Sequence, residues 1–131
     1  MGSPAAKKGD PVVGVDTHVV LVASPGGPVP TPMPLPFNGP LSGDLSTTVV
    51  IDDAPAALDG STADNAPAHV PAGGPFQTPP ATKGTVEATC TTVLVDNRAL
   101  ARGNDPALTC NDPADAPNGV VVASSTILVG D

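Results

Sequence analysis

Three short runs of apolar and β-branched residues set the pattern of this chain. They occupy residues 47–53 (TTVVIDD), 91–97 (TTVLVDN) and 125–131 (STILVGD). Each run closes on Asp, Asn or Gly, which is typical of a short strand that enters a tight turn. The apolar residues follow one another almost without interruption, so part of each strand is expected to be buried on both faces. The sequence similarity of the three runs indicates an internal repeat.

The repeat extends beyond the strands. PAALDGS at 55–61 follows the first run, and ALARGND at 99–105 follows the second. The counterpart for the third run stands at the other end of the chain, where PAAKKGD occupies residues 4–10. The sequence therefore predicts three copies of one unit, circularly cut so that the strand at 125–131 lies beside the segment at 1–10.

One segment is unusually rich in proline. Seven prolines fall in the 16 residues from Pro25 to Pro40, and a related passage recurs at 73–79. Proline lacks the N–H that a sheet ladder uses and favours extended polyproline II backbone. We therefore expect residues 25–40 to form a loop that wraps over the surface and takes no part in a sheet.

The composition points to a small fold with a thin core. The 131 residues include 18 prolines and 14 glycines, no Trp or Tyr, and only two Phe. Such a chain favours turns over long helices, and it lacks the aromatic side chains that bury the most surface per residue. We predict a small all-β fold that forms a single domain over residues 1–131, stabilised by a metal ion, a disulfide or a partner.

Charge and hydropathy argue against nucleic-acid binding and against a membrane-spanning segment. The net charge is −8, with 13 acidic and five basic residues, and nucleic-acid binding needs clustered Lys and Arg. No apolar stretch approaches the roughly 20 residues of a membrane span, and the N-terminus has no signal-peptide core. We expect a protein made in the cytoplasm, where cysteines normally remain reduced.

At this point the chain resembles the PAAR-repeat family, whose small proteins cap the central spike of contractile injection systems. The resemblance rests on PAAKKGD at 4–10, its variants at 55–61 and 99–105, and the matching strands, and it covers most of the chain. It implies a small cone of short strands with internal pseudo-three-fold symmetry. A single copy would cap a trimeric β-helical spike protein and sharpen it for puncture of a target membrane.

The resemblance also implies one structural zinc ion at the point of the cone, held by histidines and a cysteine. It places the protein in an injection particle of the type VI secretion or phage-tail-like kind that is delivered outside the cell or into a target cell, where a non-covalently docked effector is a further expected partner. We expect no enzymatic activity. Asp10, Asp16, Asp52 and Asp53 are assigned to strand ends and turns, where Asp accepts local backbone hydrogen bonds.

The candidate zinc ligands are the two histidines and two cysteines of the chain. His18 and His69 each lie eight residues after a repeated motif, and Cys110 lies five residues after the third. A pseudo-three-fold fold would therefore bring these three together, and four tetrahedral ligands are typical of structural zinc. Cys90 is the expected fourth ligand, with water or Asp112 as alternatives at that position.

The alternative function is a secreted β-domain that acts as a binding module. In that case a Cys90–Cys110 disulfide would stabilise the small fold by constraining the unfolded chain. A proline-rich and largely unstructured protein is a third possibility, although it leaves the triple repeat unexplained. The redox state of the two cysteines separates these possibilities from the zinc hypothesis.

Overall fold

The computed structural model describes residues 2–130, so Met1 and Asp131, the outermost residues of the two segments predicted to meet, lie outside it. Within this range the chain forms twelve β-strands and no helix, which confirms the predicted all-β class. No helix long and apolar enough to cross a membrane occurs in the described part of the chain. The strands are β1 (Ser3–Pro4), β2 (Pro11–Val22), β3 (Val29–Gly43), β4 (Val50–Ile51), β5 (Ala54–Pro55), β6 (Thr62–Asp64), β7 (Lys83–Val86), β8 (Leu94–Val95), β9 (Arg98–Ala99), β10 (Pro106–Thr109), β11 (Ala116–Val121) and β12 (Leu128–Val129).

Three antiparallel hairpins form a closed barrel. They are β2–β3, β6–β7 and β10–β11, and the ring runs β10-β11-β2-β3-β6-β7. Each hairpin follows one of the repeated motifs, so the barrel has the three-fold order of the sequence. Its interior is filled mostly by small side chains with one aromatic ring, as the composition suggests: Val12, Phe37, Leu41, Ala63, Val86, Ala107 and Val121.

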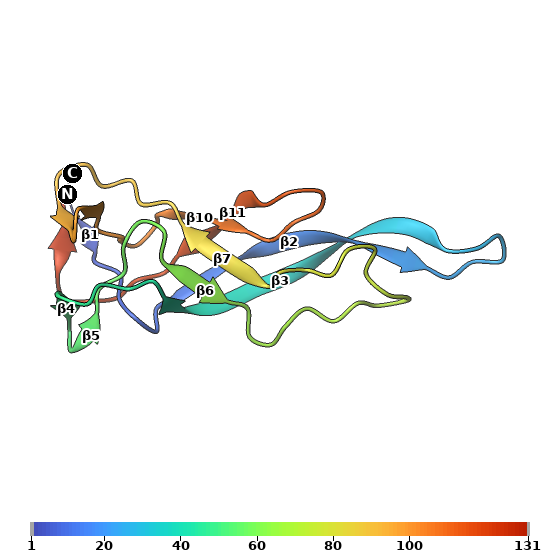
Figure 1. Ribbon diagram of the computed structural model, residues 1–131, viewed down its shortest axis with the longest axis horizontal. Coiled ribbons are helices and arrows are strands. Elements are labelled where there is room, and N and C mark those ends of the chain that lie inside the picture. Colours follow the sequence, from blue (N-terminus) through green and yellow to red (C-terminus); the bar gives the residue numbers. More distant parts are fainter. Residues whose placement is uncertain (1, 131) are drawn as a thin grey trace.

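The three repeated strand runs form two-stranded ribbons at the broad end of the molecule (Figure 1). These ribbons are β4–β5, β8–β9 and β1–β12. In the first two, both turn residues have positive φ, namely Asp52 and Asp53 in one and Asp96 and Asn97 in the other. That conformation suits Asp and Asn and matches the twist of a two-residue hairpin.

The third ribbon joins the two ends of the chain. Strand β1 pairs with β12, with Ser3 opposite Val129 and Pro4 opposite Leu128. The C-terminal strand therefore lies beside the N-terminal segment, the arrangement that the circular cut of the repeat leads one to expect. Both termini lie at this broad end (Figure 1), which we call the base: the three ribbons β4–β5, β8–β9 and β1–β12.

Above the base the backbones of the three motifs meet in a closed ring. The N–H of Ala6 donates to the carbonyl of Ala101, Ala101 donates to Ala57, and Ala57 donates back to Ala6, at 2.9–3.0 Å. All three side chains are fully buried. Only a small side chain leaves room for three backbones to approach one axis, which explains why alanine stands at this position in every repeat.

The same motifs share a turn that feeds each barrel hairpin. Asp10 and Asp105 accept the backbone N–H three residues earlier through Oδ2, and Ser61 does so through Oγ. The preceding residues, Gly9, Gly60 and Asn104, all have positive φ. The expectation that Asp10 serves a turn is thus confirmed.

The proline-rich segment is where the sequence-based interpretation is wrong. Residues 29–43 form β3, which pairs with β2 from Val29 to Pro40, so that only residues 25–28 of the proline-rich segment lie outside this ladder. Four of the five prolines of β3 fall on every second residue and therefore face the same edge: Pro30, Pro32, Pro34 and Pro36. The residues opposite the first three, Leu21, Val19 and Thr17, form backbone hydrogen bonds with other loops and need no N–H donor from β3. The ladder therefore loses no hydrogen bond, and these four prolines lie along the outer edge of β3.

The β2–β3 hairpin makes the molecule elongated. The β2–β3 hairpin extends far beyond the barrel at the end opposite the base, and the molecule tapers toward its tip (Figure 1). The other two hairpins are shorter, and their loops lie at 65–82 and 110–115, the first of which is much longer than the turn between β2 and β3. The three-fold order of the base is therefore lost toward the tip.

Replacing Pro32 and Pro34 together by threonine should make the protein self-associate. Each change restores a backbone N–H on the open edge of β3, and exposed edges with free donors pair with other chains. Sedimentation velocity should show a concentration-dependent increase in mass relative to the parent, while Pro79→Thr, in an exposed loop, should leave the mass unchanged. Equal behaviour of the two variants would contradict the protective role of the edge prolines.

Candidate metal centre

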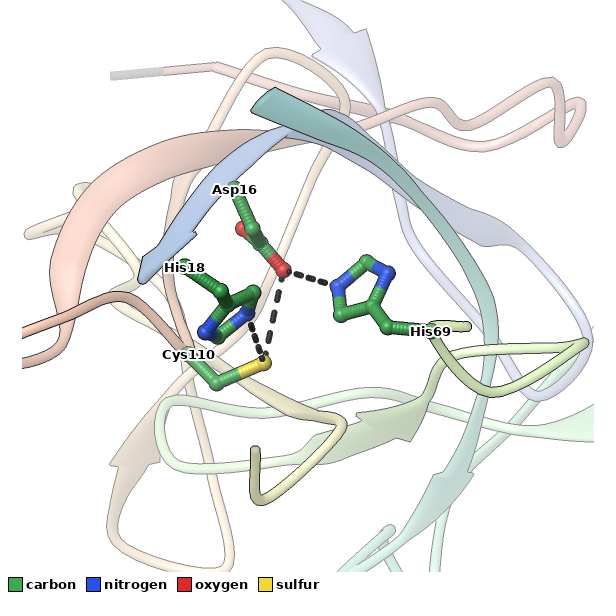
Figure 2. Close-up of side chains that lie close together, drawn as sticks. All are labelled: Asp16, His18, His69 and Cys110. Carbon is green, nitrogen blue, oxygen red and sulfur yellow. Dashed lines mark hydrogen bonds and ion pairs between the residues drawn. The ribbon is translucent and has the colours of Figure 1, made fainter. Parts of the chain in front are cut away.

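Four potential metal ligands converge between the barrel and the extended hairpin. They are Asp16, His18, His69 and Cys110, and the ligand atoms that they offer all lie within 4.8 Å of one another. The four side chains point toward a common centre (Figure 2). Asp16, His18 and Cys110 are at most 3% exposed, and the side chain of His69 is 2% exposed. We call these four residues the cluster.

Each of the three repeats contributes to the cluster. Asp16 and His18 lie two residues apart on β2, so both side chains project from the same face of the strand. Cys110 follows β10 of the third hairpin directly. His69 belongs to the 65–82 loop of the second hairpin, which is held against β2 by backbone hydrogen bonds from Leu21 to Pro75 and from Gln77 to Val19.

Asp16 is the common acceptor of the cluster. Its Oδ2 lies 2.9 Å from His69 Nε2 and 3.3 Å from Cys110 Sγ. His18 Nε2 lies 3.7 Å from the same sulfur. Two buried polar atoms remain without a hydrogen-bond partner among the described residues, Asp16 Oδ1 and His18 Nδ1. Such unpartnered buried atoms are uncommon in folded proteins.

The thiol of Cys110 is protonated at neutral pH. Burial, the negative charge of Asp16 and the hydrogen bond to Asp16 together raise the pKa of this thiol to about 11. A thiolate at the same place would lie beside a carboxylate in a buried site, an arrangement that needs a compensating cation. The cluster thus holds a dense set of donors that is electrostatically incomplete by itself.

The donor set and the spacing fit a transition-metal ion. Two imidazoles, one thiolate and one carboxylate are all accepted zinc ligands, at bond lengths of about 2.0–2.3 Å. Tetrahedral placement at those lengths separates neighbouring ligand atoms by about 3.3–3.8 Å. Three pairs in the cluster lie 2.9, 3.3 and 3.7 Å apart, and all pairs lie within 4.8 Å. The cluster can therefore hold one metal ion after small movements of its side chains.

Binding at His69 requires one local adjustment. Asn65 Oδ1 accepts the backbone N–H of Asn38 at 2.8 Å, which directs its Nδ2 toward His69 Nδ1 at 3.1 Å. The ring of His69 accordingly carries its proton on Nε2 and donates it to Asp16. A metal ion at Nε2 displaces this proton to Nδ1, so the Asn65 amide must turn to accept it.

Cys90 does not belong to the cluster. It is buried at the base, in a core shared with Ala5, Ile51 and Val129, whereas Cys110 belongs to the core of the barrel. Cys90 precedes the run at 91–97 as Ser46 precedes the run at 47–53, and the Ser46 hydroxyl accepts the N–H groups of Thr48 and Val49. Burial alone would raise the pKa of the Cys90 thiol, but equivalent hydrogen bonds from Thr92 and Val93 outweigh it and lower the pKa. Cys90 is thus placed as a turn residue.

The predicted disulfide alternative is also wrong for this structure. Cys90 and Cys110 are both free, and they lie in different cores. Asp112, the other suggested fourth ligand, lies behind His18, with its Oδ2 3.7 Å from His18 Nδ1. The ordered barrel likewise argues against a largely unstructured chain.

Asp16 was assigned to a turn from the sequence, and this assignment is wrong. It lies in the middle of β2 and is fully buried. The signal that could have identified it is the Asp16-x-His18 spacing within a run of Val residues, because alternation along a strand places both side chains on one face.

Comparisons with known proteins do not assign this site. No family model matches the chain, and neither a curated protein nor a solved structure shows significant similarity to it. The class of the protein therefore rests on its fold and on the cluster: a small three-fold β-barrel protein with a potential metal-binding site.

The stability of the metal-free protein should fall as the pH rises from about 9 to about 11. The unfolded chain ionises the Cys110 thiol at its ordinary pKa of 9.0, whereas the folded chain retains the proton up to about 11, so unfolding releases a proton in this range. Urea unfolding of the parent and of Cys110→Ser, each in the presence of a chelator, should give midpoints that differ in their pH dependence above pH 9 and run parallel below it. Parallel curves throughout would contradict the raised pKa.

Proposed function

We propose that this chain is the structural tip of the central spike of a contractile injection system, as its resemblance to PAAR-repeat proteins suggests. One copy caps a trimeric β-helical spike protein through its base. One structural zinc ion fastens the part of the molecule that faces away from the spike. The observation that carries this proposal is the cyclic three-fold order of the base within a single chain.

That order is repeated in two sets of contacts. The first is the alanine ring, whose three hydrogen bonds also close the bridges that link Ala5 with Arg102, Lys7 with Ala56, and Leu58 with Leu100. The second joins neighbouring ribbons, as Asp52 accepts from Thr126 and Asp96 accepts from Thr48. A surface with three-fold order matches a three-fold partner with one copy of this chain, because each repeat can meet an equivalent subunit.

The base also presents three equivalent apolar side chains. Val50, Leu94 and Leu128 begin strands β4, β8 and β12, and they are 62%, 64% and 66% exposed. The residue after each of them is buried, so each strand presents one residue outward and one to the core. Burial of one such side chain in an interface contributes about 1.5–3 kcal/mol. Three contacts around one axis favour a partner with the same symmetry.

Zinc is the ion that best accounts for the cluster. Zinc accepts all four donor types and favours the tetrahedral arrangement that the spacing allows. Four protein ligands leave no position for a reactive water, so the proposed role is structural and not catalytic. The ion would join β2 to the 65–82 loop and to the residue after β10, which come from different repeats.

The purified protein should contain about one zinc ion per chain. Cys110→Ser and His69→Ala each remove one ligand and should lower the zinc content well below one. Cys90→Ser is the matched control: it removes a cysteine from a position where Ser46 serves in another repeat, and it should retain the full content. Elemental analysis after dialysis measures this. Equal loss in Cys90→Ser and Cys110→Ser, or no zinc in the parent, would contradict the proposed site.

The base should bind a trimeric β-helical spike protein from the same cell. Val50→Asp, Leu94→Asp and Leu128→Asp should each weaken binding about tenfold or more, because each loses an apolar contact and places a charge in the interface. Val70→Asp, which changes an equally exposed valine in the 65–82 loop, should bind like the parent. Isothermal titration gives both the affinity and the stoichiometry, and a ratio other than one chain per trimer would overturn the capping proposal.

A further inference from the structure

The ring of His18 is buried with one of its two nitrogens unpartnered. The side chain is 1% exposed, and Nδ1 has no hydrogen-bond partner among the described residues. Nε2 faces the cluster, 3.7 Å from Cys110 Sγ. A neutral imidazole that binds a metal ion through Nε2 carries its proton on Nδ1. Zinc binding would therefore create a buried N–H donor that needs an acceptor.

Asp112 is placed to accept this proton. Its Oδ2 lies 3.7 Å from His18 Nδ1, which is too long for a hydrogen bond in the structure as it stands. The residue is fixed on both sides of His18, because Val19 N–H donates to Oδ2 at 2.8 Å and Asp112 N–H donates to the Thr17 carbonyl at 2.9 Å. Asp112 also lines a cavity of about 220 Å³ together with Val19 and Gln77.

We propose that Asp112 is a positioning residue that accepts the Nδ1–H of His18 when zinc binds at Nε2. This inference rests on the proposed zinc site. The required approach is about 1 Å, from 3.7 Å to the length of a charge-assisted hydrogen bond. A carboxylate behind a metal-bound histidine fixes its tautomer and its orientation and strengthens it as a ligand. The contact would also satisfy the orphaned nitrogen.

Asp112→Asn tests the contact with little change in shape. The amide oxygen can still accept from Val19, but the negative charge behind His18 is lost. Zinc affinity, measured by competition with a chromophoric chelator, should fall about 10- to 100-fold. Asp115→Asn removes the same charge from an exposed position in the same loop and should stay within about twofold of the parent.

A second measurement separates positioning from a merely structural role. In the zinc-loaded parent, nitrogen-15 NMR of His18 should show a protonated Nδ1 with a slowly exchanging proton, and Asp112→Asn should speed that exchange. This measurement on the parent also decides the matter if the variant does not fold. Ligation through Nδ1, or equal zinc affinities for Asp112→Asn and Asp115→Asn, would overturn the positioning role alone. A parent that binds no zinc would overturn this role together with the proposed zinc site.

Discussion

The structure depends on three backbone hydrogen bonds that close a ring around the pseudo-three-fold axis. Ala6, Ala57 and Ala101 each donate to one neighbour and accept from the other. No repeat can make these bonds alone, so the ring forms only when all three motifs meet. Burial of the ring makes each bond difficult to lose, because an unpaired buried peptide group costs about 1–3 kcal/mol. The base ribbons lie on one side of this ring and the barrel hairpins on the other (Figure 1).

The three hairpins need a further contact with one another beyond the barrel, in addition to the alanine ring. Its core consists mainly of Ala and Val and contains one aromatic ring, Phe37. Beyond it the three hairpins diverge in length, so symmetric packing cannot continue toward the tip. The 65–82 loop and the residue after β10 both come to rest on β2, and the cluster lies where they meet. Zinc in small peptides contributes about 10–16 kcal/mol of apparent binding free energy, comparable to the whole stability of a typical domain.

The base could be predicted from the sequence because its strands belong to the repeated runs and motifs. Matching runs and motifs give the three ribbons and the meeting of the two termini. The β3 strand could not be found by counting prolines, since what matters is that they alternate and so fall on one edge. The prediction of Cys90 as the fourth ligand, and of Asp16 as a turn residue, failed for a related reason. Residue type favoured the thiol, whereas position decided: Cys90 is equivalent to the turn residue Ser46, and Asp16 shares a strand face with His18.

The three repeats therefore contribute equally at the base and unequally at the cluster. At the base each repeat contributes an equivalent exposed residue, the arrangement on which the proposed capping of a trimer depends. At the cluster the first repeat supplies two side chains, and the other two supply one each. A tetrahedral ion needs four ligands, so three equivalent contributions could not complete its coordination. The second side chain from the long β2–β3 hairpin, Asp16, thus provides a potential fourth ligand that a strictly three-fold protein would lack.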